Sequence, residues 1–328
     1  MTGQDPQSLT PEQLARGSIA ELAAGRLPLT SQWRVDTQRR AAAEGRATFT
    51  SGLSVDEFAV LRSAGFVPVG QVMGSAVYNV GWSFTGCGYR GGLFTNYRPT
   101  PVVDVPATRQ IMEEARHRAL DRLRQECAGL GGDGVIGVQV SVGQFYGNGL
   151  EFVVMGTAVR SLGPTRPAVP FTSDLSGQDF AKLVLAGWLP TALVMGVGVA
   201  LRHDDLALMW QQRSPFNQEL PGPTQLVATV RGAARASLQA DVRRRGGHTA
   251  VLREMTVDIN EVSCRRGGQD SRDHLADAFL LGTALVALPG HDPGAPAAGA
   301  PGAGAGAPAA GVPISIRRLD GRPDRREP

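Results

Sequence analysis

The apolar and polar positions of this chain follow one pattern in its first half and the same pattern again in its second. Over residues 66–80 apolar side chains alternate with others, which favours a strand. From residue 106 to 130 they recur every three or four residues, which is typical of one face of a helix, and Glu113, Arg116, Asp121 and Arg124 lie off this face. Residues 134–142 and 151–160 alternate again, on either side of a Gly-Asn-Gly turn signal. The pattern therefore predicts a strand, a long helix and a hairpin.

The second occurrence of this pattern contains the same elements in the same order. We expect a helix over residues 224–245 and strands over 249–260 and 278–288. Residues 171–196 also align without a gap to residues 49–74, with 14 of 26 positions identical. Self-similarity at one offset indicates one supersecondary unit built twice.

One stretch of the second copy has the length of a membrane span. Residues 183–201 contain no charged side chain and are long enough to cross a bilayer as a helix. The equivalent stretch of the first copy carries Arg62 and Gln71, and both copies place a glycine and then a proline in mid-segment. We therefore expect a helix that ends at Gly187 and then a buried strand, and we do not expect a membrane protein.

Composition divides the chain into four parts. Residues 1–48 are polar and carry a helix-start signal, so we expect a partly helical leader. Residues 49–163 and 171–288 are the two copies of the repeated unit. Residues 289–328 are a Gly/Ala/Pro linker followed by a charged C-terminal tail, and such a linker cannot bury a core.

Charge and cysteine content narrow the class of protein. A net charge of +3 is too mild to indicate a nucleic-acid-binding protein. The three cysteines, Cys87, Cys127 and Cys264, have no paired spacing, so a disulfide framework is not expected. The N-terminus is polar and lacks a signal-peptide pattern. Together these features favour a cytoplasmic protein.

Groupings that carry metal or catalytic chemistry do not stand out. Zinc sites use Cys and His at short spacing, whereas Cys127 falls on the apolar stripe of the predicted helix and Cys264 in a basic polar loop. The one compact cluster, His203-Asp204-Asp205, fits a solvated turn. The glycines match no dinucleotide or phosphate-binding loop, and no Ser/His/Asp grouping has support. We predict a non-enzymatic protein with no cofactor and no dedicated metal site.

Three segments of the first copy carry a family resemblance. They are Gly70–Val77 (GQVMGSAV), the helix-to-strand passage Leu130–Val135 (LGGDGV) and Gly156–Val159 (GTAV). Together these residues resemble the YbjQ-like family, and the second copy matches it more weakly, with His248 in place of Asp133. The resemblance implies a domain described as heavy-metal-binding, built as a small β-α-β-β unit like a dodecin subunit and assembling into a pentameric ring.

We therefore expect an α+β fold of two tandem β-α-β-β units that forms rings. Closed rings are the usual outcome of a repeating head-to-tail contact. If each unit keeps the five-fold packing that the resemblance implies, the partner of each chain is another copy of itself. The expected assembly is a homopentamer in which five chains supply ten repeat units, as two stacked rings of five.

Two segments are candidate interaction sites. The first is a Gly-rich loop over residues 81–105, whose aromatic side chains suit an interface or a ligand surface, or alternatively pack against a neighbouring unit within the ring. Its candidate residues are Trp82, Phe84, Cys87, Tyr89, Phe94 and Tyr97. The second is the tail, which fits a docking peptide on a flexible tether or, alternatively, an ordinary disordered terminus. Its candidate residues are Ile314, Ile316, Arg317, Arg318 and Leu319.

These observations favour a ring-forming scaffold or binding module that engages a protein partner through the aromatic loop, the tail or both. The rival hypothesis comes from a different class of protein. It is a metal- or small-ligand-binding protein that acts in stress or homeostasis.

Overall fold

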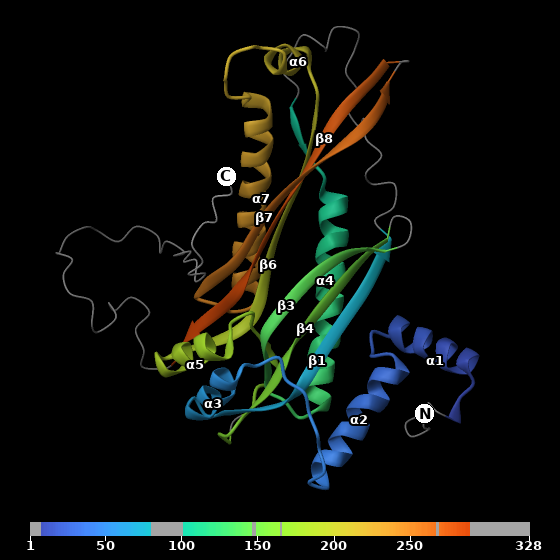
Figure 1. Cartoon of the computed structure of the whole chain (residues 1–328), viewed down its shortest axis with the longest axis vertical. Coiled ribbons are helices and arrows are strands. Elements are labelled where there is room, and N and C mark those ends of the chain that lie inside the picture. Colours follow the sequence, from blue (N-terminus) through green and yellow to red (C-terminus); the bar gives the residue numbers. More distant parts are fainter. Residues whose placement is uncertain (1–7, 80–100, 146–148, 165, 267–268, 289–328) are drawn as a thin grey trace, which may run out of the picture.

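The computed structural model describes residues 8–79, 101–145, 149–164, 166–266 and 269–288. Within these ranges the chain is a mixed α+β protein with two four-stranded sheets (Figure 1). The expected α+β fold class is confirmed. No helix in the described part of the chain is long and apolar enough to cross a membrane.

Two helices lie before residue 49, in the segment expected to be a partly helical leader. They are α1 (Pro11–Ala23) and α2 (Leu29–Ala43). Helix α2 buries Val35, and the guanidinium of Arg34 pairs with the buried carboxylate of Glu126 at 2.5 Å. The leader is therefore packed on the rest of the molecule.

The first half of the chain then contains the predicted strand, long helix and hairpin. Its elements are α3 (Val55–Ser63), β1 (Phe66–Asn79), β2 (Val102–Asp104), α4 (Pro106–Gly129), β3 (Gly134–Phe145) and β4 (Gly149–Ser161). The predictions for β1, α4, β3 and β4 are confirmed. Strand β2 has three residues, too few to leave a periodic pattern in the sequence.

The second half repeats this order with additions. Its elements are β5 (Phe171–Thr172), α5 (Gly177–Leu185), β6 (Trp188–His203), α6 (Leu206–Gln212), α7 (Pro221–Arg244), β7 (Thr249–Arg266) and β8 (Gln269–Ala287). Strands β7 and β8 extend further than predicted and pair along their whole length. The expected polar loop around Cys264 is therefore wrong, because this residue lies within β7.

The strands of the two halves have the same order. The first sheet is ordered β1-β4-β3-β5 and the second β2-β6-β8-β7. Each sheet also takes one short strand from the other half. Strand β5 runs parallel to β3, and β2 runs antiparallel to β6. The two halves are therefore joined by strand exchange at both sheets.

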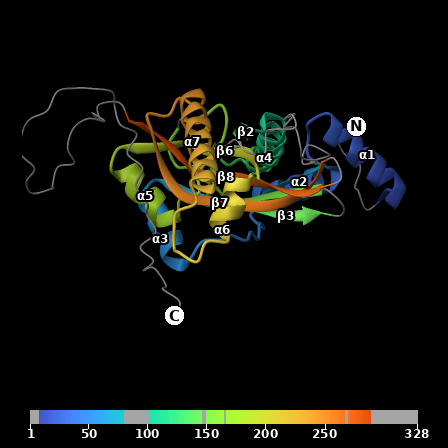
Figure 2. The ribbon, with the colours of Figure 1, turned by 90° about the horizontal axis from the view of Figure 1, so that it is seen from above.

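Helix α4 lies between the two sheets, and α7 covers the opposite face of the second sheet (Figures 1 and 2). Side chains along β6 alternate between these two helices. Leu193 and Met195 belong to the hydrophobic cluster around α4, whereas Val194 and Ala200 belong to the cluster around α7. A strand buried on both faces needs apolar residues at nearly every position. This explains the uncharged stretch 183–201, and the expected helix end at Gly187 followed by a buried strand is confirmed.

Both halves bring helix and strand unusually close at one glycine. A Cβ atom on Gly74 of β1 would lie 2.0 Å from the carbonyl oxygen of Ala119 of α4. A Cβ atom on Gly196 of β6 would lie 2.1 Å from the carbonyl oxygen of Ala234 of α7. Only glycine allows backbones to approach this closely. The equivalence of these pairs aligns α4 with α7 and β1 with β6.

Candidate functional site

Helix α4 has a second buried row in addition to the row that faces its own sheet. The residues of this row follow one another at intervals of four: Thr108, Met112, Arg116, Leu120 and Arg124. Helix α7 buries none of the equivalent positions. The additional burial of α4 comes from the second half of the chain, whose apolar side chains on β6 and β8 belong to the same hydrophobic cluster. The contact between the two halves is therefore the candidate site that the burial of α4 indicates.

The guanidinium of Arg116 lies between two aromatic rings in this contact. Its Cζ atom is 5.1 Å from the ring centroid of Phe152 on β4 and 4.2 Å from that of Phe279 on β8. Its Nε and Nη1 atoms are buried without a hydrogen-bond partner, so cation–π attraction to the rings of both halves stabilises the charge. Burial lowers the pKa of Arg116 to about 10, so it stays charged at neutral pH.

Two aspartates of the second sheet influence this charge. Asp277 on β8 is directly opposite Asp258 on β7. Burial and then the Asp258 charge raise the pKa of Asp277 to about 6, while Arg116 acts in the opposite direction. Like charges at opposed positions destabilise a strand pair. Arg116 of the first half therefore offsets a repulsion within the second sheet.

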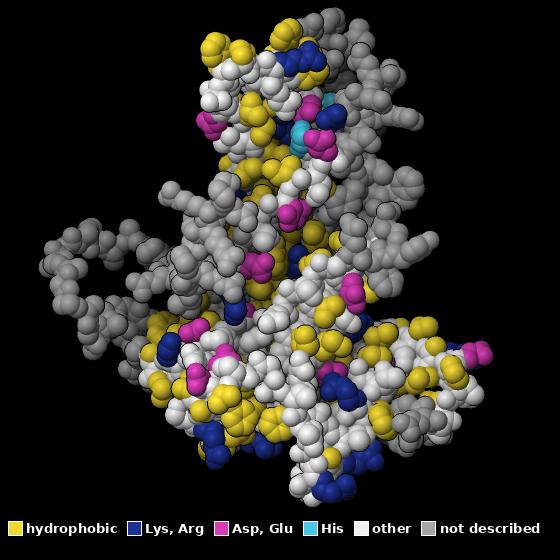
Figure 3. Space-filling view, in the orientation of Figure 1, with side chains coloured by type: hydrophobic (Ala, Val, Ile, Leu, Met, Phe, Trp, Pro, Cys, Tyr) yellow, Lys and Arg dark blue, Asp and Glu magenta, His cyan; other side chains and the backbone are white. Residues whose placement is uncertain are grey.

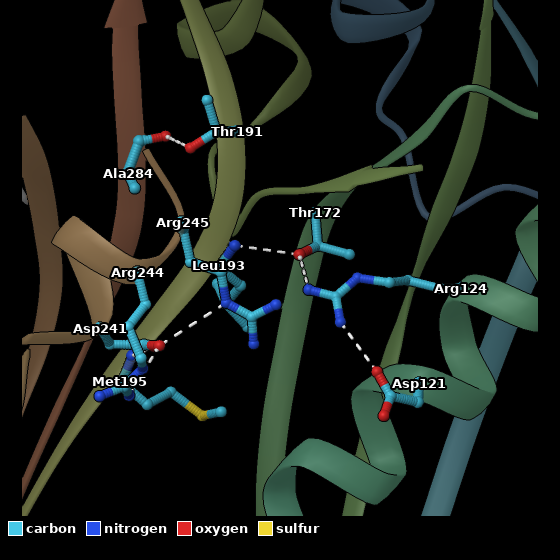
Figure 4. Close-up of polar contacts among 10 residues, drawn as sticks. All are labelled: Asp121, Arg124, Thr172, Thr191, Leu193, Met195, Asp241, Arg244, Arg245 and Ala284. Carbon is cyan, nitrogen blue, oxygen red and sulfur yellow. Dashed lines mark hydrogen bonds and ion pairs between the residues drawn. The ribbon is translucent and has the colours of Figure 1, made fainter. Parts of the chain in front are cut away.

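A polar relay lies beside this contact, at the edge of β6 (Figure 4). Arg124 Nη2 and the backbone N–H of Leu193 both donate to Thr172 Oγ1, at 3.3 and 2.9 Å. Arg124 Nη1 also donates to Asp121 at 3.0 Å. The Thr172 hydroxyl therefore satisfies an edge N–H group of the second sheet, and Arg124 connects this hydroxyl to α4 of the first half.

In each half, a carboxylate on the long helix accepts a hydrogen bond from the backbone N–H of an edge-strand residue. The N–H of Met195 donates to Asp241 Oδ2 at 3.2 Å, as Figure 4 shows for the second half. The N–H of Met73 donates to Glu126 Oε2 at 2.8 Å in the first half. The two carboxylates occupy equivalent places on α7 and α4. The same hydrogen bond between helix carboxylate and strand N–H therefore positions each long helix on the edge strand of its own sheet.

An aromatic cluster forms a further part of the contact between the halves. Phe171 and Phe180 of the second half stack at 5.6 Å, and Phe66 of the first half meets their rings edge-on at 6.2 and 5.0 Å. The backbone N–H of Gly177 in α5 donates to Glu57 Oε1 of α3 at 3.0 Å. Helices α3 and α5 therefore pack together as a pair.

The cluster His203-Asp204-Asp205 is buried or partly buried, so the expectation of a solvated turn is wrong. His203 Nδ1 pairs with the fully buried Asp273, and Asp204 pairs with His274 Nε2 at 2.9 Å. Asp205 pairs with a buried arginine and accepts the N–H of Leu208 at 2.8 Å, which caps α6. The polar groups fix the long end of β6 to β8 and begin the next helix. Their role in this arrangement is structural.

The described residues hold no group of three or more His, Cys, Asp and Glu side chains placed to bind a metal ion. Cys127 is buried, as predicted, and burial raises the pKa of its thiol to about 12. A protonated thiol is a poor metal ligand and nucleophile. A shallow cavity of about 280 Å³ is lined by α4 alone, through Gln110, Glu113, Glu114, His117, Arg118 and Asp121. It offers mixed charges from a single helix and no catalytic grouping.

The interaction residues predicted from the sequence lie outside the described part of the chain. They are Trp82, Phe84, Cys87, Tyr89, Phe94 and Tyr97 of the loop, and Ile314, Ile316, Arg317, Arg318 and Leu319 of the tail. Arg116 and Asp277 were missed. The helical pattern placed Arg116 on the polar side of α4. Its interval of four from Met112 and Leu120 is the one sequence signal for a second buried row.

Comparison with known proteins gives two kinds of match. The family model described as "Putative heavy-metal-binding" matches residues 104–161. The encapsulin nanocompartment protein Rv1762c of Mycobacterium tuberculosis is 34% identical over 212 residues, which cover 62% of this chain and 76% of that protein. A UPF0145 protein of Halorubrum lacusprofundi is 41% identical over 51 residues, which cover 16% of this chain and 49% of that protein.

The raised pKa of Asp277 predicts a pH dependence of stability. Its folded pKa of about 6 lies above the ordinary value of 3.8, so its contribution is full below pH 3.8 and is lost as the pH rises through 6. Allowing for partial exposure, we expect the free energy of unfolding to fall by up to about 2 kcal/mol from this group. Urea unfolding of the wild type and of Asp277→Asn at pH 4.5 and 7.5 measures the difference, since the variant lacks this loss.

Asp258→Asn is the matched control for this prediction. Removing the Asp258 charge lowers the pKa of Asp277, so the loss of stability should begin at lower pH than in the wild type. Parallel pH profiles for the wild type and Asp277→Asn would contradict the assignment.

Proposed function

We propose that this chain, which belongs to the same family as the nanocompartment protein of M. tuberculosis and matches the YbjQ-like family model over residues 104–161, is a non-enzymatic, ring-forming scaffold or binding module. The proposal has three parts. The two halves are tandem copies of one unit, the units associate with one another, and the resulting assembly binds a protein partner.

The tandem copies are supported by equivalent contacts in the two halves. Both sheets have the same order of long strands, and both halves pair a strand glycine with a helix alanine. A helix carboxylate accepts the N–H of Met73 in one half and of Met195 in the other. We take residues 49–163 and 171–288 as the two units, between a helical leader and a C-terminal tail.

The observation that carries the proposal is the position of α4 between two sheets. The outer row of side chains on α4 of the first unit is buried because the sheet of the second unit covers it. A contact of this head-to-tail kind is repeated from unit to unit and closes into a ring when the rotation allows. Each chain adds two units, so a closed ring holds an even number of units. Five chains with ten units satisfy this condition, so we propose one ring of ten units in place of the two stacked rings of five expected from the sequence.

The relative from M. tuberculosis supplies a cellular setting for the proposal. Its name assigns it to an encapsulin nanocompartment, a protein assembly. We propose that the present chain works with such a compartment in the cytoplasm, through self-association and through a protein partner. The aromatic loop over residues 81–105 and the tail remain the proposed partner sites.

Native mass spectrometry of the full chain at micromolar concentration tests the self-association. We expect a mass near five chains, because each chain carries two units that associate with units of neighbouring chains. A monomer at this concentration would contradict the proposed function. Dilution into the nanomolar range gives the matching control, since a true assembly releases smaller species in a concentration-dependent way.

Metal binding is the second candidate function, and the description of the matched family model favours it. The described residues offer no ligand cluster, and the thiol of Cys127 is buried and protonated. We therefore expect no stoichiometric zinc, copper or nickel in protein purified without an affinity tag. Calorimetry that finds a site tighter than micromolar, and loses it in Cys87→Ser, would favour the metal function instead.

The tail gives a prediction about partners. A Gly/Ala/Pro tether raises the effective concentration of a terminal peptide, and Ile314, Ile316 and Leu319 suit apolar pockets while Arg317 and Arg318 suit acidic rims. Deleting residues 289–328 should leave the melting temperature and native mass unchanged and remove a protein from pull-downs of native lysate. An identical pull-down profile would show that the tail is not a docking segment.

A further inference from the structure

We propose that the free end of the first unit in one copy binds the free end of the second unit in another copy, through the same contact that joins the two units within a chain. This inference rests on the proposed self-association and names its surfaces. The partner is a second copy of this chain. Four parts of the intrachain contact have a counterpart at the ends of the molecule: the aromatic cluster, the sheet face, the Arg–carboxylate pair and the strand edge.

The alignment of the two units follows from their shared contacts. Gly74 and Gly196 each touch the carbonyl of a helix alanine, and that relation equates position 119 of α4 with position 234 of α7. The repeated segments 49–74 and 171–196 equate α3 with α5 without a gap. The Gly-Thr-Ala runs at 156–158 and 282–284 equate β4 with β8.

The aromatic part of the contact has an exposed counterpart in the first unit. Phe180 is 0% exposed at the junction of the units, whereas its counterpart Phe58 on α3 is 43% exposed. Phe171 packs on the ring of Phe180, whereas its counterpart Phe49 is 38% exposed. Figure 3 shows apolar side chains gathered over α3 and α5 at the lower left of this face. The first unit therefore exposes the counterparts of one buried ring, Phe180, and one partly buried ring, Phe171.

The second unit has an apolar surface of matching composition. Phe180 lies in a cluster with three apolar residues of the first unit, which are Leu61, Ile136 and Val159. The counterparts of these residues in the second unit are Leu183, Val251 and Leu285, which are apolar as well. Leu183 and Val251 are partly buried, so Phe58 of one copy can add to this apolar surface on α5, β7 and β8 of the next.

The outer face of the first sheet is the counterpart of the sheet face that covers α4. Four apolar residues lie on it: Met73, Val77, Val153 and Met155. Their counterparts in the second sheet are all buried against α4 or beside it: Met195, Val199, Phe279 and Leu281. In the described part of the chain no helix packs on the outer face of the first sheet as α4 packs on the second. We assign α7 of a second copy to this face.

Charge complementarity supports that assignment. Arg116 of α4 lies close enough to Asp277 of β8 to influence its pKa. The counterpart of Arg116 is Arg231, which is exposed on α7, and the counterpart of Asp277 is Glu151, on the outer face of the first sheet. Placing α7 of one copy on the first sheet of the next brings this second Arg–carboxylate pair together. Opposite charges at equivalent places favour the head-to-tail arrangement.

The strand edges agree with the same arrangement. The N–H groups of Phe171 and Ser173 donate to carbonyls of residues 133 and 135, so the start of the second unit adds a strand to β3. The counterpart of β3 is β7, which is the last strand of its sheet in the described residues. Residues 49–51 of another copy can add to this edge in the same way, which would also protect it from non-specific pairing.

The copy-to-copy contact differs from the intrachain contact at several positions. Ala278 replaces Phe152 and Val153 replaces Phe279, so Arg231 lacks both of the rings that hold Arg116. On the outer row of the helix, Arg235 replaces the buried Leu120 and Gln239 replaces Arg124. Thr249 replaces Gly134, against which the Phe171 ring is packed, so the ring of Phe49 must take a shifted position. These changes weaken the contact. We therefore expect chains to separate on dilution before the two halves of one chain do.

Two variants test the inference, and each disrupts one of the two proposed binding surfaces. Phe58→Glu blocks the first-unit end, and Arg231→Glu blocks the second-unit end by setting like charges against Glu151. Each variant alone should have the native mass of one chain, because every contact needs both ends. An equimolar mixture should give a mass of two chains and no more, because one intact end of each variant remains.

Matched controls use residues of the same type outside the proposed surfaces. Phe216→Glu changes a more exposed phenylalanine in the loop before α7, and Arg243→Glu changes an exposed arginine on another side of α7. Both should keep the wild-type mass. Circular dichroism melting checks that every variant is folded, and dimer formation in the mixture shows this independently.

The outcomes separate the inference from the function on which it rests. A monomeric wild type defeats the proposed self-association. An assembled wild type whose end variants stay assembled defeats the inference and leaves self-association intact. Monomeric variants that do not dimerise on mixing would show a symmetric contact between identical surfaces, and this also overturns the head-to-tail assignment.

Discussion

Helix α4 is packed against two sheets at once, and these sheets belong to different halves of the chain. Its first buried row follows the ordinary rule for a helix on its own sheet, with Gly74 allowing close approach to Ala119. Its second row, with Arg116 between Phe152 and Phe279, has no reason to be buried in one unit alone. The polar relay at the edge of β6 joins this shared helix to the second half, and the exchange of β2 and β5 and the aromatic cluster add further contacts between the halves.

The contrast between α4 and α7 explains how a duplicated unit can serve as an assembly module. The two helices use the same glycine and carboxylate devices to sit on their own edge strands, yet one is covered on its outer row and the other is exposed. A unit that binds its neighbour through different surfaces always leaves one of each surface free at the ends. The exposed Phe58 and Arg231 lie on the two surfaces that this arrangement leaves free, one at each end of the chain.

Local periodicity predicted most of the fold, and long-range contacts explain what it missed. Strand β1 and helix α4 were readable because alternation and three-to-four spacing are local properties. The short strands β2 and β5 form only because the other half supplies their partner edge. Arg116 was read as a polar-face residue because its second aromatic partner, Phe279, lies far away in the sequence. The His203–Asp273 pair was missed for the same reason, since it forms only when β6 meets β8.

An electron cryo-microscopy structure of the assembled protein would show what covers the outer face of the first sheet. We expect α7 of a neighbouring chain on this face, with Arg231 beside Glu151 and with Phe58 buried against the neighbour's α5. A particle in which this face is exposed to solvent, or in which identical surfaces meet across a two-fold axis, would contradict head-to-tail assembly.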